Sequence, residues 1–294
     1  SKVFFANSGA EANEGAIKLA RKYSFDKYGE KRSTIITLKQ SFHGRTLTTL
    51  SATGQEKYHN YFFPFTKGFK HVIANDYEDF LNSLDTSICA IMMEAIQGEG
   101  GVRPLEEDYV KKVFAKCKEN DILVIFDEVQ CGIGRTGLLF GFNHFDVEPD
   151  IVTIAKGLAS GLPIGAVLCN EKLSKVLKPG DHGSTFGANP VASAAALVVL
   201  NKICKEEFLE SVDLKGKEIK HFFNKNNLAV EVRGKGLMIG IQIQGDSSKV
   251  QNEALGKGLL VLTAGPDVIR LLPPLVINKE ELEKGLEILY QVIS

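Results

Sequence analysis

The sequence predicts an α/β protein with a mostly parallel central sheet and a smaller α+β unit at its C-terminal end. In the first two thirds of the chain, short apolar runs alternate with longer amphipathic helical segments, and this alternation ends near residue 205. With 294 residues, the chain is long enough for one large domain and a second, smaller one. We therefore expect a large domain over residues 1–205 and a small domain over residues 206–294.

The first part of the chain contains several runs that are typical of buried strands. They are apolar throughout and rich in β-branched residues, as strands of a parallel sheet covered on both faces must be. Helices are expected over residues 11–28 and 107–118, the second with one apolar stripe. The stripe residues are Tyr109, Val110, Val113, Phe114 and Cys117, and the predicted strands cover residues 1–5, 33–38, 88–93, 122–126 and 151–154.

The pattern changes after about residue 205, and no internal repeat or low-complexity segment is present. Two helical stretches lead into a series of short strands and a closing helix, which is typical of an α+β unit. The predicted helices cover residues 190–203 and 207–226 and begin again at residue 279, and the predicted strands cover residues 229–233, 237–243, 258–262 and 268–272.

The composition narrows the class of protein. A net charge of −1 favours neither a nucleic acid nor an acidic membrane as partner, and no run of 18 apolar residues predicts a membrane-spanning helix. Five scattered cysteines without framework spacing favour a reducing compartment, so we expect the cytoplasm. No pair of histidines has ligand spacing, and no metal site is expected. Because the chain opens on a strand-like run without methionine, we expect a preceding segment, which would carry any targeting signal.

The first candidate site lies at Ser8, Gly9 and Ala10, between the opening strand and the first helix. Backbone N–H groups are free at the N-terminus of a helix, which makes this position suited to a phosphate. A serine that merely caps the helix is an equally good interpretation of this segment alone.

Two ionisable residues follow buried strands 29 residues apart. Asp127 ends one apolar run, and Lys156 ends the next and precedes a glycine-rich segment. Ligands of open α/β sheets bind at the carboxyl ends of the strands. A lysine there, partly desolvated, suits Schiff-base chemistry, whereas alone it would be interpreted as a surface residue. A pyridine cofactor needs a carboxylate at its ring nitrogen, a lysine for its aldehyde and a phosphate cradle.

One competing motif is weaker. Residues 132–137 match the GxGxxG pattern of dinucleotide-binding proteins. Five residues separate the motif from its strand, and the apolar residues after it do not continue as a helix. A nicotinamide site therefore stays a remote alternative.

Taken in order, the motifs SGAEANE, SFHGRT, EAIQGEGGV, FDEVQCGIGRTG, DIVTIAKGL, HGSTFGANP and RGKGLMIG cover nearly the whole chain. Together they resemble the class III aminotransferases, pyridoxal-phosphate enzymes of fold type I. Within that class, GEGGV and VLTAGPDVIRLLPPLVI resemble the members that act on N2-acetylornithine. The resemblance implies pyridoxal 5′-phosphate as cofactor, small amino acids as substrates and a homodimer with shared sites.

The resemblance also implies roles for individual residues. Lys156 would bind the cofactor aldehyde covalently and Asp127 would pair with the ring nitrogen, and these two are the catalytic residues. Arg45 would clamp the carboxylate remote from the reacting carbon, Arg270 would take the α-carboxylate of glutamate, and Glu99 would pair with Arg270 when an ω-amine is bound. Further cofactor contacts are implied for Ser8, Gly9, Ala10, Phe42, His43 and Gln130, for Thr185 across the dimer interface, and a substrate contact for Ser184.

The expected reaction moves the δ-amino group of N2-acetyl-L-ornithine to 2-oxoglutarate. Ornithine, succinylornithine and 4-aminobutyrate remain alternative amines, and a chain that binds the cofactor without catalysis is a further alternative.

Overall fold

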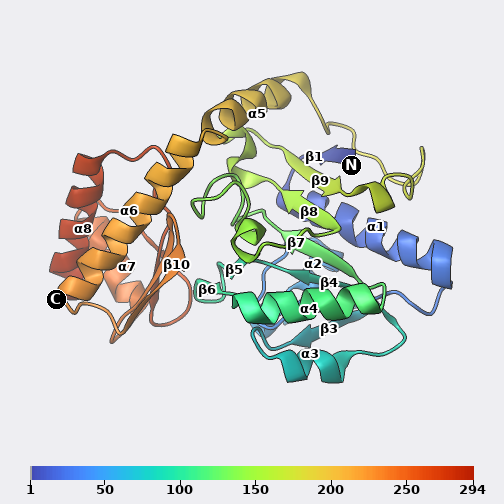
Figure 1. Ribbon diagram of the computed structural model, residues 1–294. Helices are drawn as coiled ribbons and strands as arrows, with labels where there is room; N and C mark the ends of the chain where they lie inside the picture. Colours follow the sequence, from blue (N-terminus) through green and yellow to red (C-terminus); the bar gives the residue numbers. More distant parts are fainter. Residues whose placement is uncertain (1) are drawn as a thin grey trace.

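A seven-stranded sheet with helices on both faces forms the larger part of the protein (Figure 1). The computed structural model describes residues 2–294, so the predicted opening strand is seen only from Lys2 onward, because Ser1 lies outside the described residues. The strand order is β1-β9-β8-β7-β4-β2-β3, and only β9 runs antiparallel to its neighbours. The predicted α/β class is confirmed. The strands are β1 Lys2–Ala6, β2 Thr34–Leu38, β3 Phe69–Val72, β4 Ile88–Met93, β7 Leu123–Asp127, β8 Ile151–Ile154 and β9 Gly165–Cys169.

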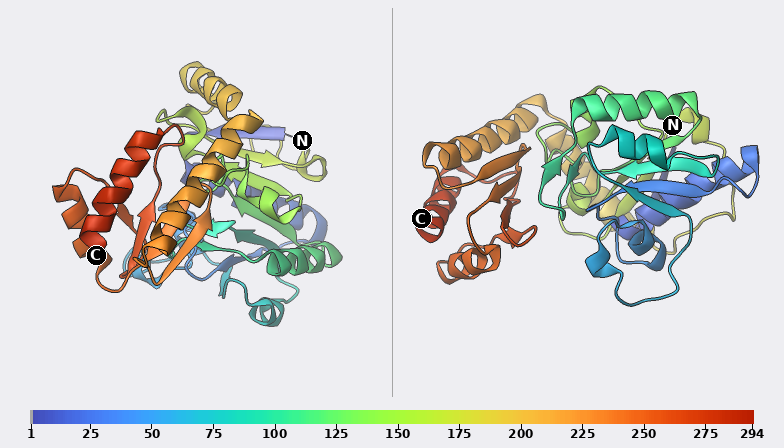
Figure 2. Two further views of the ribbon diagram at one scale, coloured as in Figure 1. Left: turned by 60° about the vertical axis from the view of Figure 1, so that its left-hand side comes forward. Right: turned by 90° about the horizontal axis from the view of Figure 1, so that it is seen from below.

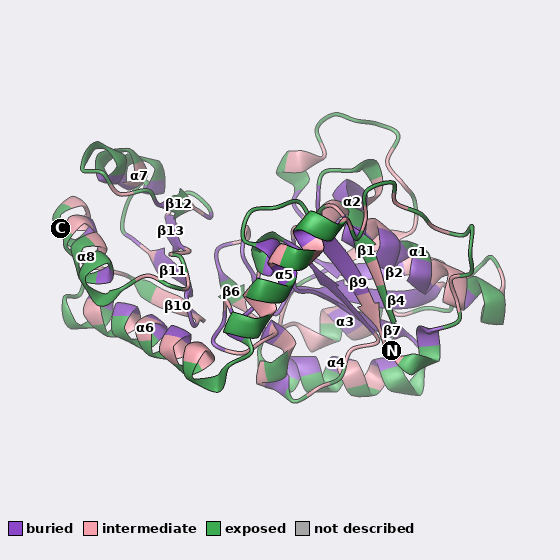
Figure 3. Ribbon diagram, turned by 90° about the horizontal axis from the view of Figure 1, so that it is seen from above, coloured by how far each residue is buried: buried purple, intermediate pink, exposed green. Residues whose placement is uncertain are grey.

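Both faces of this sheet are buried, which explains the continuous apolar runs. Side chains of a strand alternate between the two faces. In β4, Ala90 and Met92 join a core cluster with the buried face of α1, whereas Ile91 and Met93 join a second cluster with α4 and α3. The central strands β4, β7 and β8 are consequently buried along their length, whereas the edge strands β1 and β3 are more exposed (Figure 3). The helices of this part are α1 Gly9–Tyr28, α2 Leu47–Ala52, α3 Tyr77–Ser83, α4 Glu107–Glu119 and α5 Pro190–Ile203.

A second unit stands beside the large sheet and has a core of its own (Figure 2). Its sheet is antiparallel, in the order β10-β11-β13-β12, and three helices pack around it. The elements are β10 Glu231–Lys235, β11 Met238–Gln242, β12 Leu262–Thr263, β13 Val268–Leu271, α6 Glu206–Lys225, α7 Ser247–Gly256 and α8 Lys279–Ile293.

Most predicted elements are confirmed within two residues, and one strand is largely wrong. The strand expected over residues 258–262 is instead β12, Leu262–Thr263. Gly258, with φ +84°, forms the turn that ends α7, and residues 259–261 connect this turn to β12 without pairing with β13. We did not predict the strands β3 and β9 or the helices α2 and α3 of the large unit. Further elements that we did not predict are the strands β5 Ile96–Gln97 and β6 Arg103–Pro104 and the 3₁₀ turns η1 Glu56–Tyr58, η2 Gly141–Phe145, η3 Lys156–Ala159 and η4 Glu171–Leu173.

Within residues 2–294, no helix has the length and apolar character needed to cross a lipid bilayer.

Candidate active site

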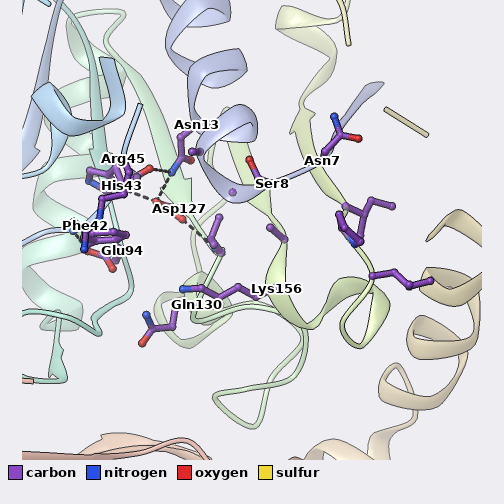
Figure 4. A pocket seen from close by; sticks show the side chains of 18 of the residues that line it. Asn7, Ser8, Asn13, Phe42, His43, Arg45, Glu94, Asp127, Gln130 and Lys156 are labelled. Atoms are coloured by element: carbon purple, nitrogen blue, oxygen red, sulfur yellow. Dashed lines mark hydrogen bonds and ion pairs between the residues drawn. The ribbon is translucent and has the colours of Figure 1, made fainter. Parts of the chain in front are cut away.

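A cavity of about 500 Å³ opens where β7 and β8 end and α1 begins (Figure 4). The sheet order makes β7 and β8 parallel neighbours, so their carboxyl ends meet at one edge, as the sequence predicted. Segments more than 140 residues apart in the chain thus contribute to one site. The predicted residues that line it are Ser8, Gly9, Ala10, Phe42, His43, Arg45, Asp127, Gln130 and Lys156.

Asp127 is the last residue of β7 and is almost fully buried. Its carboxylate accepts three hydrogen bonds, from Asn13 Nδ2 at 2.7 Å, His43 Nδ1 at 2.8 Å and the Val129 N–H at 3.0 Å. An ionised carboxylate has about four acceptor positions. Asp127 is therefore held rigidly and retains room for one further donor from the cavity.

Two side chains behind Asp127, Asn13 and Thr153, were not predicted as site residues from the sequence. Asn13, on the buried face of α1, also donates to the His43 carbonyl at 2.7 Å, and its Oδ1 accepts from Thr153 Oγ1 at 2.7 Å. Burial alone would lower the pKa of His43, but the hydrogen bond to the Asp127 carboxylate outweighs it and the pKa is raised. His43 thus acts on Asp127 as a donor from behind. Asn13, His43 and Thr153 orient the carboxylate.

Lys156 is the second residue after β8 and begins η3. Its φ of +42° is left-handed, which is uncommon for a residue with a side chain and is tolerated mainly at functional sites. The prediction of a partly desolvated amine is wrong for this chain, because Lys156 is exposed to the open cavity. Among residues 2–294, no hydrogen bond or ion pair holds its ammonium group.

The N-terminus of α1 faces the same cavity. The Ser8 side chain accepts from the Glu11 N–H at 3.2 Å, so it caps the helix. The N–H groups of Gly9 and Ala10, in the first turn, have no partner within a helix. A Cβ at Gly9 would lie 2.7 Å from Val129, so glycine lets the helix start against the strand end. The capping interpretation of Ser8 is confirmed. The phosphate site stays a prediction, with which the cap is compatible because it leaves the next two N–H groups free for an anion.

Glu94 is a second buried carboxyl group in the cavity wall that the sequence interpretation missed. It follows β4 directly, and its Oε2 accepts from the Phe42 N–H at 3.0 Å. Burial raises its pKa to about 7. The same signal that identified Asp127, an acid after a buried strand, was available for Glu94.

Arg270 lies on β13 of the second unit and reaches the edge of the site. Its Nη1 donates to Glu99 Oε1 at 2.6 Å and to Gln130 Oε1 at 3.2 Å. The Arg270 side chain is only 7% exposed, so a surface ion pair is the wrong description of this residue. Gln130, which lines the cavity, links the arginine to the site, and a Cβ at Gly98 would collide with the Gln130 amide.

The remaining predicted residues lie farther out. Arg45 is exposed at the cavity mouth, its guanidinium 5.5 Å from the centroid of the Phe42 ring. Ser184 Oγ accepts from Asn7 Nδ2 at 3.1 Å and from the Gly187 N–H at 3.0 Å, so it touches the cavity only through Asn7. Thr185 is exposed and does not line the cavity.

The glycine motif over residues 132–137 forms consecutive turns with no helix after it, as the sequence predicted. It contacts the second unit instead. Arg135 Nη1 donates to the carbonyls of Leu237 at 3.0 Å and Pro273 at 2.6 Å. A Cβ at Gly236 would lie 2.4 Å or so from the backbone of this motif, a collision that glycine avoids. The motif joins the two units.

Known proteins resemble this chain along its whole length. Residues 1–293 match the family model described as aminotransferase class-III. An acetylornithine aminotransferase from Caldanaerobacter subterraneus subsp. tengcongensis is 54% identical over 100% of this chain and 76% of that protein. The acetylornithine aminotransferase of Haemophilus ducreyi is 53% identical over 100% of this chain and 75% of its own length.

Solved structures agree with the sequence comparison. An ornithine aminotransferase from Toxoplasma gondii, described with partial occupancy of PLP at its active site, has a TM-score of 0.94 at 32% identity, covering 100% of this chain and 72% of that one. The N-acetylornithine aminotransferase from Stenotrophomonas maltophilia K279a has a TM-score of 0.84 at 37% identity, covering 100% and 74%. The chain belongs to the class III aminotransferases.

Proposed function

We propose that this chain is a pyridoxal-phosphate-dependent transaminase that moves the δ-amino group of N2-acetyl-L-ornithine to 2-oxoglutarate. The products are N-acetyl-L-glutamate 5-semialdehyde and L-glutamate, a step of arginine biosynthesis. One observation carries the proposal: Asp127 and Lys156, at adjacent strand ends, line one cavity with the N-terminus of α1. The substrate assignment is supported by the relatives that are 53% and 54% identical over the whole chain.

The residues present fit the cofactor. The free N–H groups of Gly9 and Ala10 suit a phosphate, and Asp127 keeps an acceptor position for a protonated ring nitrogen. The Lys156 amine is unpaired within residues 2–294 and suits an aldehyde. When bound, pyridoxal phosphate supplies an electron sink for the carbon that bears the amino group.

Each side chain then has one task. Asp127 keeps a proton on the ring nitrogen, Lys156 Nζ removes and returns the proton of the reacting carbon, and Phe42 is the aromatic platform for the ring. Gln130 Oε1 is bonded to Arg270 here, so we assign its contact to the ring hydroxyl to the side-chain nitrogen.

Carboxylate recognition is assigned to two arginines, whose planar fork suits that group. Arg45 at the mouth would hold the α-carboxylate of acetylornithine. Arg270 would hold the α-carboxylate of glutamate. Glu99, which pairs with Arg270 in this structure, would keep that ion pair when the uncharged end of a substrate is bound.

Lys156→Ala is the direct test. It should abolish turnover and the absorbance of the lysine-bound cofactor, and a variant with full activity would refute the site. Adding acetylornithine to cofactor-loaded wild-type protein should remove that absorbance. A response to ornithine but not to acetylornithine would overturn the substrate.

We also propose a homodimer with shared sites, in which Thr185 lies at the phosphate end of the neighbouring subunit's site. Support comes from exposed aromatic side chains beside Thr185 and over residues 61–63, since large exposed apolar groups mark interfaces. Phe186 is 71% exposed, and Tyr61, Phe62 and Phe63 are between 62% and 71% exposed. Sedimentation should give twice the chain mass of 32.2 kDa, and a monomer would refute the shared site.

Two further assignments complete the proposal. We divide the chain after residue 205, between α5 and α6, because the core cluster of the C-terminal unit is separate. We place the protein in the cytoplasm, since its five cysteines are all free.

A further inference from the structure

Arg45 differs from the other proposed substrate-binding residues because no hydrogen bond or ion pair fixes its side chain within residues 2–294. It is exposed at the mouth of the cavity. A long, flexible arginine loses considerable side-chain entropy when a ligand fixes it. A useful carboxylate clamp therefore needs something that orients the guanidinium group beforehand.

The closest partner of the Arg45 guanidinium is an aromatic ring. The Arg45 Cζ lies 4.4 Å from the centroid of the Tyr58 ring and 5.5 Å from that of Phe42. The two rings meet edge to face, with centroids 5.7 Å apart and an interplanar angle of 74°. The guanidinium is thus seated against two mutually packed rings, a favourable arrangement for a cation. Arg45 and Phe42 lie on the same side of the cavity (Figure 4).

Tyr58 is itself held in place by the backbone around it. It ends η1, and its N–H donates to the Gln55 carbonyl at 3.1 Å. Gln55 is buried, and its Nε2 donates to the Ser41 carbonyl at 3.0 Å. Gly54 is tied to the same loop through the Gln40 N–H at 2.7 Å. The segment that carries Tyr58 is thereby anchored to the loop that carries Arg45.

In the part of the chain that the structure describes, residues 2–294, no carboxylate forms an ion pair with Arg45. The other cation at the Tyr58 ring is Lys57, whose Nζ lies 4.9 Å from the centroid. Stacking on a ring leaves the edge N–H groups of a guanidinium free, so the fork can still bind a carboxylate in two hydrogen bonds.

We propose that Tyr58 is a positioning residue that orients the Arg45 guanidinium toward the carboxylate of the amino donor and so contributes to substrate specificity. This inference rests on the proposed function of Arg45. Tyr58 is predicted to act only on substrates that bear this carboxylate, because it does not line the cavity itself.

A matched pair of amines separates this role from a structural one. N-acetylputrescine is N2-acetylornithine without the carboxylate. Tyr58→Leu should lower kcat/KM for acetylornithine by about two- to fivefold, mostly through KM, as expected for an exposed cation–π contact. Its kcat/KM for N-acetylputrescine should stay unchanged. Tyr58→Phe, which keeps the ring, should retain the wild-type ratio of the two values.

Lys57→Gln is the control, because it removes a neighbouring charge and leaves the platform of Arg45 intact. The ratio should stay at the wild-type value. Equal losses on both amines in Tyr58→Leu, no loss on either, or an equal loss in Tyr58→Phe would overturn the proposal.

The test stays informative should the substrate assignment fail. If wild-type protein ignores acetylornithine and accepts ornithine, ornithine and putrescine differ by the same carboxylate and serve as the pair. Calorimetric binding of the two amines to a Lys156→Ala background gives a readout independent of turnover. There, Tyr58→Leu should weaken only the carboxylate-bearing amine by the same factor, and equal weakening of both amines would count against the proposal.

Discussion

Replacing Asn13 with alanine tests whether the network behind Asp127 is a structural necessity. Asn13 is 1% exposed on α1, and its side chain makes three hydrogen bonds, each 2.7 Å long. Two are donated to Asp127 and the His43 carbonyl, and one is accepted from Thr153. Water cannot replace these partners readily, because all four groups are buried.

The expected cost follows from these bonds. The bond to a carboxylate is worth about 1.5–3 kcal/mol and each neutral bond about 1 kcal/mol. Alanine regains roughly 0.5 kcal/mol of helix propensity. We expect Asn13→Ala to lower the free energy of unfolding by about 3–4.5 kcal/mol, and to weaken cofactor binding because Asp127 loses one of its three donors.

Urea unfolding followed by far-ultraviolet circular dichroism measures the first effect, and titration with pyridoxal phosphate the second. Thr153→Val is the matched control. It removes only the hydroxyl that bonds Asn13, and should cost about 1 kcal/mol while leaving the bond to Asp127 in place. If Asn13→Ala is no less stable than Thr153→Val, the reasoning about the network is wrong.

Two further predictions concern the other acids of the site. Burial raises the pKa of Glu94 to about 7, so between about pH 4.5 and 7 the folded chain retains a proton that the unfolded chain has released, and stability falls as pH rises through this window. Glu94→Gln keeps an acceptor for the Phe42 N–H. It should make the decrease of the free energy of unfolding with pH shallower by about 1.4 kcal/mol per pH unit, measured by urea unfolding at a series of pH values. An unchanged slope would count against the assignment. Glu99→Gln should release Arg270 from its 2.6 Å ion pair. Because charge-assisted bonds are worth about 1.5–3 kcal/mol, KM for 2-oxoglutarate should fall by roughly tenfold in steady-state assays, whereas an increase would contradict the proposed switch.

The strands β2, β4, β7 and β8 were predictable because burial on both faces imposes one pattern, whereas β3 and β9 were not predicted. The strands over residues 88–93 and 151–154 were predicted with their observed bounds. The direction of β9 was not predictable in this way. Its residues are as apolar as those of a parallel strand, and only pairing with β1 and β8 makes it antiparallel. Tertiary pairing, absent from local sequence, decides direction.

The residues of the candidate site likewise fall into those that local sequence predicts and those that depend on tertiary packing. Asp127 and Lys156 were found because an ionisable residue at the end of an apolar run has few favourable positions in a fold. Glu94 satisfies the same rule, because it directly follows the buried strand β4, but the sequence prediction did not include it. Asn13 carried no such signal, since one polar residue on a helix is ordinary until the helix packs against a charged strand end.

Tyr58 shows most clearly what sequence cannot supply. Its position 13 residues after Arg45 has no period or motif that would link the two, and a tyrosine in a polar turn is unremarkable. The contact exists because two hydrogen bonds hold its turn against the loop of Arg45, from Gln55 Nε2 to the Ser41 carbonyl and from the Gln40 N–H to the Gly54 carbonyl. Residues that bear the chemistry need special positions and leave a trace in the sequence, whereas residues that orient them need only be nearby. The specificity that we propose for Arg45 and Tyr58 therefore depends on a loop contact that becomes visible only when the sheet has brought the two loops together.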